Sequence, residues 1–200
     1  MTPAHLTPIW HIKSPSSFPK DPSLQTIFSK TNHEVFVITA NGEPSSGFIA
    51  TWVLPASLVP GTPRLLVLAS PLNYTTQLIR DSKKFVVNLL ADDQSSLIPH
   101  FGLLSGKSQD KLASIDHQES DFGPLLDHTC GYAQCLLSKE VDLGERVILI
   151  GDVEHHTVHP KEALTKNHGF GSLPEEIRQQ LVEKHRTLGE ESRALFGPLT

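Results

Sequence analysis

The sequence contains few of the residue patterns from which chemistry is usually recognised. Only two cysteines, Cys130 and Cys135, occur in 200 residues, and they do not have the spacing of a CxxC redox or zinc pair. In a strand, an odd separation places the two side chains on opposite faces. We therefore expect two buried free thiols, and no disulfide between them.

Long apolar runs and strongly charged segments are also absent. No stretch reaches the length of a membrane-spanning helix, and the N-terminus lacks the basic and then apolar pattern of a signal peptide. The formal net charge is -5, without a long Lys/Arg run, which argues against nucleic-acid binding. We therefore expect a cytoplasmic protein that binds neither nucleic acid nor membrane.

Common catalytic and metal-binding motifs are missing as well. There is no GxSxG elbow and no HExxH. A histidine cluster occurs at His155, His156 and His159. In a strand, His155 and His159 would lie about 13 Å apart and His156 would face the other way. We expect these histidines to lie at a strand end, predict no metal site, and nominate no catalytic residue.

What the sequence does have is a series of short apolar runs rich in β-branched residues. Short helices are expected between some of them, at residues 73–81 and 93–104, and Asn41-Gly42 marks a hairpin turn. Because hairpins follow one another without regular alternation of strand and helix, the order favours a mainly β antiparallel barrel. The six predicted strands are residues 34–40, 46–54, 64–70, 84–91, 131–138 and 146–158.

The two ends of the chain differ from this pattern. Residues 1–32 are rich in Pro, Ser and Thr and are expected to form an N-terminal arm, which leaves residues 33–159 for the barrel. Residues 160–200 are expected to form a C-terminal helical extension. Within it, Ser172 and Glu175 have the spacing of a capping box, and apolar residues then recur at helical spacing.

A glycine- and serine-rich stretch, FGLLSGKSQDK, follows the second predicted helix at residues 101–111. Glycine lets backbone N–H groups approach an anion closely, and hydroxyl groups and lysines add donors and charge. An ordinary solvated loop has the same composition, so this stretch alone does not establish a binding site.

Four motifs, in order along the chain, resemble those of the flavin reductase-like, FMN-binding split-barrel family. Residues 47–60 resemble its Gly-x-Thr-Ala-Ser-Trp…Ser…Pro-Pro pattern, and residues 70–75 resemble its next motif. Residues 85–90, FVVNLL, resemble its Phe-x-Val-Asn-x-Leu strand, and residues 101–111 resemble its Phe-Gly-x-x-Ser-Gly-x-x-x-Asp-Lys loop. The resemblance extends from about residue 35 to residue 158.

This resemblance implies a homodimer of six-stranded antiparallel split barrels that binds FMN, with FAD as the alternative, near the subunit interface. It also implies a reductase in which NADH or NADPH supplies electrons, since the flavin carries the chemistry. The cofactor-binding residues that it implies are Ala50, Thr51, Trp52, Ser57, Asn88, Ser105, Gly106 and Lys111.

Several of these residues also have a simpler interpretation. Asn88 could equally be a core asparagine whose amide is satisfied by backbone groups. Thr51 could be an ordinary strand residue, and Trp52 could be part of the core. Ile49 stands where the family usually has Thr, which removes one hydroxyl from the implied contacts. Two other functions therefore stay open: a non-enzymatic FMN-binding electron carrier, and a flavin-free split barrel that binds another ligand such as haem.

Overall fold

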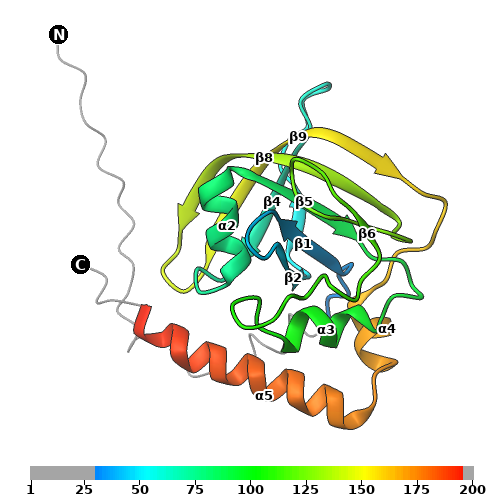
Figure 1. The fold of residues 1–200 in the computed structure, drawn as a ribbon, viewed down its shortest axis with the longest axis vertical. Coiled ribbons are helices and arrows are strands. Elements are labelled where there is room, and N and C mark those ends of the chain that lie inside the picture. The colour runs from blue at the N-terminus through cyan, green and yellow to red at the C-terminus, as the bar shows by residue number, and fades with distance from the viewer. Residues whose placement is uncertain (1–29, 196–200) are drawn as a thin grey trace.

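The computed structural model describes residues 30–195, so most of the predicted N-terminal arm lies outside the described residues. The main feature is a curved antiparallel sheet of seven strands in the order β2-β1-β5-β8-β9-β4-β3 (Figure 1). These strands are β1 (Phe36–Ala40), β2 (Ser46–Ala50), β3 (Val53–Pro55), β4 (Arg64–Ala69), β5 (Lys84–Leu89), β8 (Gly131–Asp142) and β9 (Val147–Val158).

The two edge strands of this sheet, β2 and β3, are consecutive in the chain. Only Thr51 and Trp52 separate them, so the sheet has to curve until its first and last strands meet. Trp52 O accepts a hydrogen bond from Leu68 N of β4 at 3.0 Å, just beyond the start of the β3–β4 ladder. The predicted mainly β antiparallel barrel is thus confirmed. The main sheet has seven strands, where six were predicted, because predicted strand 46–54 is interrupted at these two residues.

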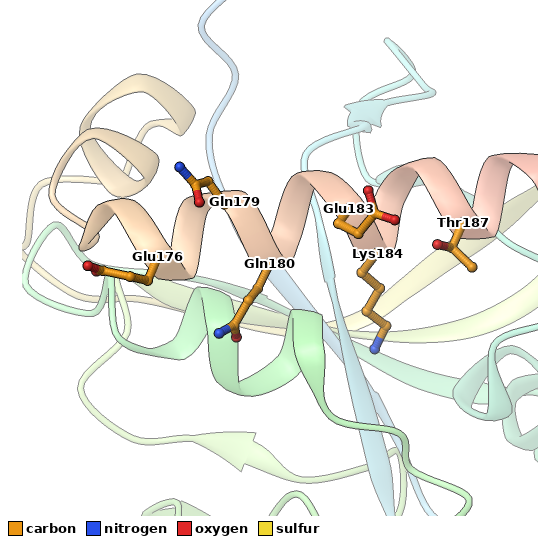
Figure 2. A pocket seen from close by; sticks show the side chains of 6 residues that line it. All are labelled: Glu176, Gln179, Gln180, Glu183, Lys184 and Thr187. Carbon is orange, nitrogen blue, oxygen red and sulfur yellow. The ribbon is translucent and has the colours of Figure 1, made fainter.

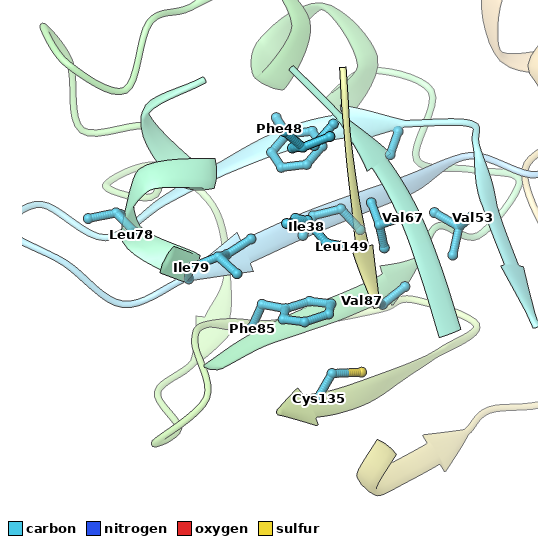
Figure 3. Close-up of a cluster of buried hydrophobic side chains, with 14 residues drawn as sticks. Ile38, Phe48, Val53, Val67, Leu78, Ile79, Phe85, Val87, Cys135 and Leu149 are labelled. Atoms are coloured by element: carbon cyan, nitrogen blue, oxygen red, sulfur yellow. The ribbon is translucent and has the colours of Figure 1, made fainter. Parts of the chain in front are cut away.

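Apolar side chains from the strands fill the interior of the barrel. Figure 3 shows Ile38, Phe85 and Leu149 among the side chains that meet there. Cys135 belongs to the same cluster, and burial raises the pKa of its thiol to about 12, with a smaller contribution from Asp152. Both cysteines are free and buried, as the sequence predicts.

Helix α2 (Tyr74–Ser82), which the sequence predicts at residues 73–81, packs on the barrel core. Leu78 and Ile79 belong to the interior cluster. On its outer side, the Arg80 guanidinium forms a bidentate pair with the Glu140 carboxylate of β8, with Nη2 at 2.7 Å from Oε1. These contacts fix α2 against the barrel core and against β8.

A second apolar cluster lies outside the barrel and joins it to the C-terminal helices. It contains Ile98 and Phe101 of α3 (Leu97–Leu103), with partly buried Ile49 of β2 and Leu181 packed against it. Leu181 belongs to α5 (Glu175–Ser192), which follows the short helix α4 (Lys166–Gly171). Figure 1 shows α3 between the barrel and α5, so the C-terminal helix packs on the barrel of its own chain.

The start of α5 differs from the sequence prediction. The predicted capping box is wrong, because the residue before the helix is Pro174 and no side chain caps the first turn. Ser172 Oγ instead donates to Gly169 O at 2.9 Å, and the Glu175 carboxylate accepts from Gln179 Nε2 at 3.1 Å. Among residues 30–195, no helix is both long and apolar enough to cross a bilayer.

Candidate functional site

Most of the predicted site residues lie at the two ends of one strand, β2. Ala50, Thr51 and Trp52 are at its C-terminal end, whereas the loop of residues 105–111, which we call the 105–111 loop, lies against its first residues. Lys111 Nζ donates to Gly47 O at 2.9 Å. At the rise of a β-strand, Gly47 and Thr51 are about 13 Å apart. The site therefore has two groups of residues connected by β2.

The C-terminal end of β2 forms an exposed group. Trp52 is 46% exposed and Leu54 is 49% exposed, whereas the Ala50 side chain lies in the barrel core. Neither the Thr51 hydroxyl nor the Trp52 indole N–H has a hydrogen-bond partner within residues 30–195. An exposed indole beside unpaired polar groups can bind a flat aromatic ligand, because it combines apolar contact with free donors.

Ser57 lies beyond this group, in the connection between β3 and β4. It is partly exposed, and its Oγ accepts a hydrogen bond from Val59 N at 3.1 Å. The neighbouring apolar side chains of Leu58 and Val59 are also exposed. The hydroxyl of Ser57 thus stabilises its own turn and still faces solvent.

The 105–111 loop packs closely on the N-terminal end of β2. Gly106 is buried, and a β-carbon built on it would overlap Ser46 Oγ and lie 3.2 Å from Tyr74 Cδ1. Ser105 is exposed, and its Oγ accepts a hydrogen bond from Lys107 N at 3.4 Å. Lys107 is exposed and forms no ion pair within the described part of the chain. The loop therefore presents a hydroxyl and a cation to solvent.

Lys111, by contrast, is turned inward. Its side chain is 5% exposed, and Nζ donates to Gly47 O and, at 3.1 Å, to Phe101 O. Burial, with a smaller contribution from the charge of Lys184, lowers the pKa of Lys111 to about 8. Two backbone carbonyls thus engage the ammonium that the resemblance assigns to the cofactor.

Asn88 is fully buried on β5 and has protein partners for its amide. Nδ2 donates to Val37 O at 3.2 Å and to Thr39 Oγ1 at 3.1 Å, and Oδ1 accepts from Leu126 N at 3.0 Å. Leu126 belongs to β7 (Leu125–Leu126), which pairs with β6 (His117–Gln118). These bonds fix the short β6–β7 ladder to the barrel and account for the amide without a ligand. Contact between Asn88 and a flavin stays a prediction.

Two residues beside the predicted ones also bear on the site. Ser46 Oγ is buried next to Gly106 and has no hydrogen-bond partner within residues 30–195. The Ile49 side chain lies 3.8 Å from a β-carbon built on Gly102, so it packs toward α3. The sequence marks Ile49 as a departure from the family pattern, but it shows neither the packing of Ile49 nor the buried Ser46 hydroxyl, because both depend on how α3 and the 105–111 loop cross β2.

The histidine cluster and the hollow along α5 contain none of the predicted site residues. His159 Nδ1 donates to Thr129 O at 2.9 Å, and His155 packs edge-on against Phe122. No group of three metal-ligand residues converges within the described residues. Figure 2 shows the hollow, which is lined by one polar face of α5: Glu176, Gln179, Gln180, Glu183, Lys184 and Thr187.

The polar groups at the two ends of β2 fit a long ligand with polar groups along its length. At the first end Ser105 is exposed, whereas Ser46 Oγ is buried next to Gly106. At the other end the Thr51 hydroxyl, which has no partner within residues 30–195, lies beside the exposed indole. The exposed Lys107 of the 105–111 loop adds a positive charge at the first end. A flavin nucleotide, with an aromatic ring at one end and a phosphate toward the other, matches this arrangement.

The sequence model of the family described as "Flavin reductase like domain" matches residues 28–174. A high molecular weight rubredoxin of Moorella thermoacetica is 35% identical over 123 residues, which are 60% of this chain and 53% of that protein. HsaB of Mycobacterium tuberculosis, the reductase subunit of a flavin-dependent monooxygenase, is 29% identical over 119 residues. These residues are 59% of this chain and 61% of HsaB, so the chain spans roughly half to three fifths of these two relatives.

Solved structures share the fold. SgcE6 of Streptomyces globisporus C-1027, an NADH:FAD oxidoreductase, superimposes with a TM-score of 0.67 at 24% identity, covering 76% of this chain and 92% of SgcE6. A second structure of SgcE6, in complex with NAD and FAD fragments, has a TM-score of 0.65. At this level of identity, the likeness shows a common barrel architecture.

Proposed function

We propose that this chain, which belongs to the flavin reductase like domain family, is an oxidoreductase that passes electrons from NADH or NADPH to a bound flavin and on to an acceptor. The flavin of this proposal is FMN, with FAD as the alternative. The acceptor is a separate molecule whose identity the site does not specify. The relative HsaB supports this class of reaction, because it is the reductase subunit of a flavin-dependent monooxygenase.

The observation that carries the proposal is the interruption between β2 and β3. At Thr51 and Trp52 the barrel exposes an indole, a hydroxyl that has no partner among residues 30–195, and the neighbouring Leu54. With Leu58 and Val59, which are also exposed, these residues make a group of exposed apolar side chains of the kind that marks a ligand or interaction site. The isoalloxazine of a flavin is flat, largely apolar on its faces and polar at its edges, so it fits this surface.

When bound, the flavin supplies the redox chemistry by accepting a hydride from the nicotinamide. The chain's own residues would bind and orient it. Trp52 would contact the ring, the Thr51 hydroxyl would donate to a polar atom at its edge, and Lys107 would offset phosphate charge. Lys111 would act indirectly, by holding the 105–111 loop against β2 through Gly47 O and Phe101 O.

A homodimer is part of the same proposal. Exposed apolar side chains at Trp52, Leu54, Leu58 and Val59 lie in one continuous segment beside the proposed flavin site. A second copy of the chain would remove this surface from water and would exclude solvent from one side of the ring. Light scattering on purified protein tests this part separately, since a monomer at working concentrations would contradict it.

The enzymatic proposal is tested by following the oxidation of NADH and of NADPH with FMN or FAD present. We expect consumption of at least one nicotinamide with at least one flavin. If the protein binds flavin and oxidises neither nicotinamide, a non-enzymatic electron carrier is the correct function. If it binds neither flavin, a flavin-free barrel is correct, and the absorbance of the protein as purified then tests for haem.

A further inference from the structure

Helix α5 lies outside residues 28–174, which match the family, yet it contacts the segment that leads into the proposed flavin site. Lys184 Nζ donates to Leu103 O, the last residue of α3, at 2.6 Å. Burial lowers the pKa of Lys184. Figure 2 shows its side chain extending from α5 toward α3.

The close approach of α5 to α3 depends on a glycine. A β-carbon built on Gly102 would lie 2.9 Å from Leu181 Cδ2, so the missing side chain makes room for α5. Leu181 and Lys184 are three residues apart and therefore share one face of α5. The apolar contact at Gly102 and the hydrogen bond at Leu103 thus act together on two consecutive residues of α3.

The 105–111 loop is consequently fixed at both ends by buried or half-buried lysines. Lys184 holds Leu103, two residues before the loop, and Lys111 closes it on Gly47 O and Phe101 O. His100 Nε2 also donates to Lys111 O at 2.6 Å. Any movement of α5 away from α3 would therefore remove the hydrogen bond at Leu103 and leave the loop held by Lys111 and by its packing on Ser46.

We infer that α5 is a clamp on the 105–111 loop and that Lys184 is a positioning residue for flavin binding. This inference rests on the proposed function. A loop that is already held in its binding position loses less conformational freedom when the ligand arrives, so the clamp raises affinity without contacting the flavin. It also gives a function to the C-terminal helix, which lies outside the matched residues 28–174.

The test uses the full chain with the variants Lys184→Met, Lys184→Arg and Arg186→Met. Arg186 is the matched control, since its ion pairs are confined to α5, with Glu183 and Glu190. Two quantities are measured: amide hydrogen exchange of residues 105–111 without flavin, and the dissociation constant for FMN and FAD. We expect Lys184→Met to speed exchange in the loop and to weaken flavin binding about tenfold, because a charge-assisted hydrogen bond is lost.

In Lys184→Arg, the loop exchange rate and the flavin dissociation constant should stay within about twofold of wild type, because a guanidinium can also donate to a backbone carbonyl. Arg186→Met should leave both unchanged. If Lys184→Met unfolds under assay conditions, Leu181→Val serves instead, since it only loosens the contact at Gly102 and should change both quantities in the same direction.

Unchanged loop exchange in Lys184→Met would overturn the clamp itself. Faster exchange with unchanged affinity would overturn its role in binding. Wild-type protein that binds no flavin would overturn the proposed function, and that result is distinguishable because loop exchange is measured without flavin.

Discussion

The backbone of Gly106 lies so close to Ser46 that a β-carbon at position 106 would overlap the Ser46 hydroxyl oxygen. Ser46 is the first residue of β2, and its side chain is buried. The contact therefore fixes how closely the 105–111 loop can approach the strand that carries Thr51 and Trp52 at its other end.

Gly106→Ala should displace the loop from β2. We expect a loss of about 1–3 kcal/mol in the free energy of unfolding, the usual cost of overpacking, and flavin binding weakened about tenfold. Gly189→Ala is the control, because a β-carbon there meets nothing within 4 Å. Adding Ser46→Ala should recover part of the affinity, since it removes the overlapping oxygen. If Gly106→Ala has the stability and the flavin affinity of wild type, the loop is not held against Ser46.

Lys111 should make stability depend on alkaline pH. Its pKa is lowered from 10.5 to about 8 in the folded protein, chiefly by burial. Below about pH 8 the lysine is charged in both the folded and the unfolded state, so the full cost of burying the charge lowers the free energy of unfolding. Between about pH 8 and 10.5 the folded state releases its proton first, so the free energy of unfolding should rise, by about 3 kcal/mol in total.

Denaturant unfolding of wild type and Lys111→Met across this pH range measures the effect. The pKa of Lys184 is also lowered by burial. Wild type and Lys111→Met both contain Lys184, so the difference between their pH profiles of unfolding free energy reports on Lys111. Parallel pH profiles in the two proteins would contradict a buried charged Lys111.

Asn88→Ala should reduce stability and leave binding intact in the protein that remains folded. The substitution removes the acceptor for Leu126 N and the donor to Thr39 Oγ1 and Val37 O. Unpaired buried groups of this kind cost about 1–3 kcal/mol each, so we expect a loss of about 2–4 kcal/mol in the free energy of unfolding. A stable variant that no longer binds flavin would instead show that Asn88 contacts the cofactor.

Thr51→Val tests the exposed group of residues at the C-terminal end of β2. Because the Thr51 hydroxyl has no protein partner within residues 30–195, the melting temperature should stay the same. Loss of a hydrogen bond to the flavin should weaken binding about three- to tenfold, as measured by flavin fluorescence titration. Equal affinity for wild type and variant would exclude Thr51 as a flavin contact.

The strands and the barrel were predictable because they follow local patterns. Alternating and continuous β-branched runs, such as residues 34–40 and 84–91, indicate strands wherever they occur, and successive hairpins leave few topologies. The interruption at Thr51 and Trp52 was not predicted, since residues 48–54 contain no glycine or proline that would mark a break. The short β6 and β7 were also missed, because two-residue strands carry no periodicity.

The site was less predictable, because its geometry depends on contacts between distant segments. The pattern of residues 101–111 places Lys111 in a loop but cannot show that Nζ points toward Gly47 and Phe101. Similarly, Ser172 and Glu175 have capping-box spacing, yet the helix begins differently because α4 precedes it. The packing of α5 on Gly102 depends on tertiary structure and leaves no local pattern.

The most direct test of the central claim is an anaerobic titration of the purified protein with FMN and with FAD, followed by addition of NADH or NADPH. The account predicts a perturbed visible flavin spectrum on binding and its bleaching when the nicotinamide is added. A protein that leaves the spectra of both flavins unchanged would contradict the account.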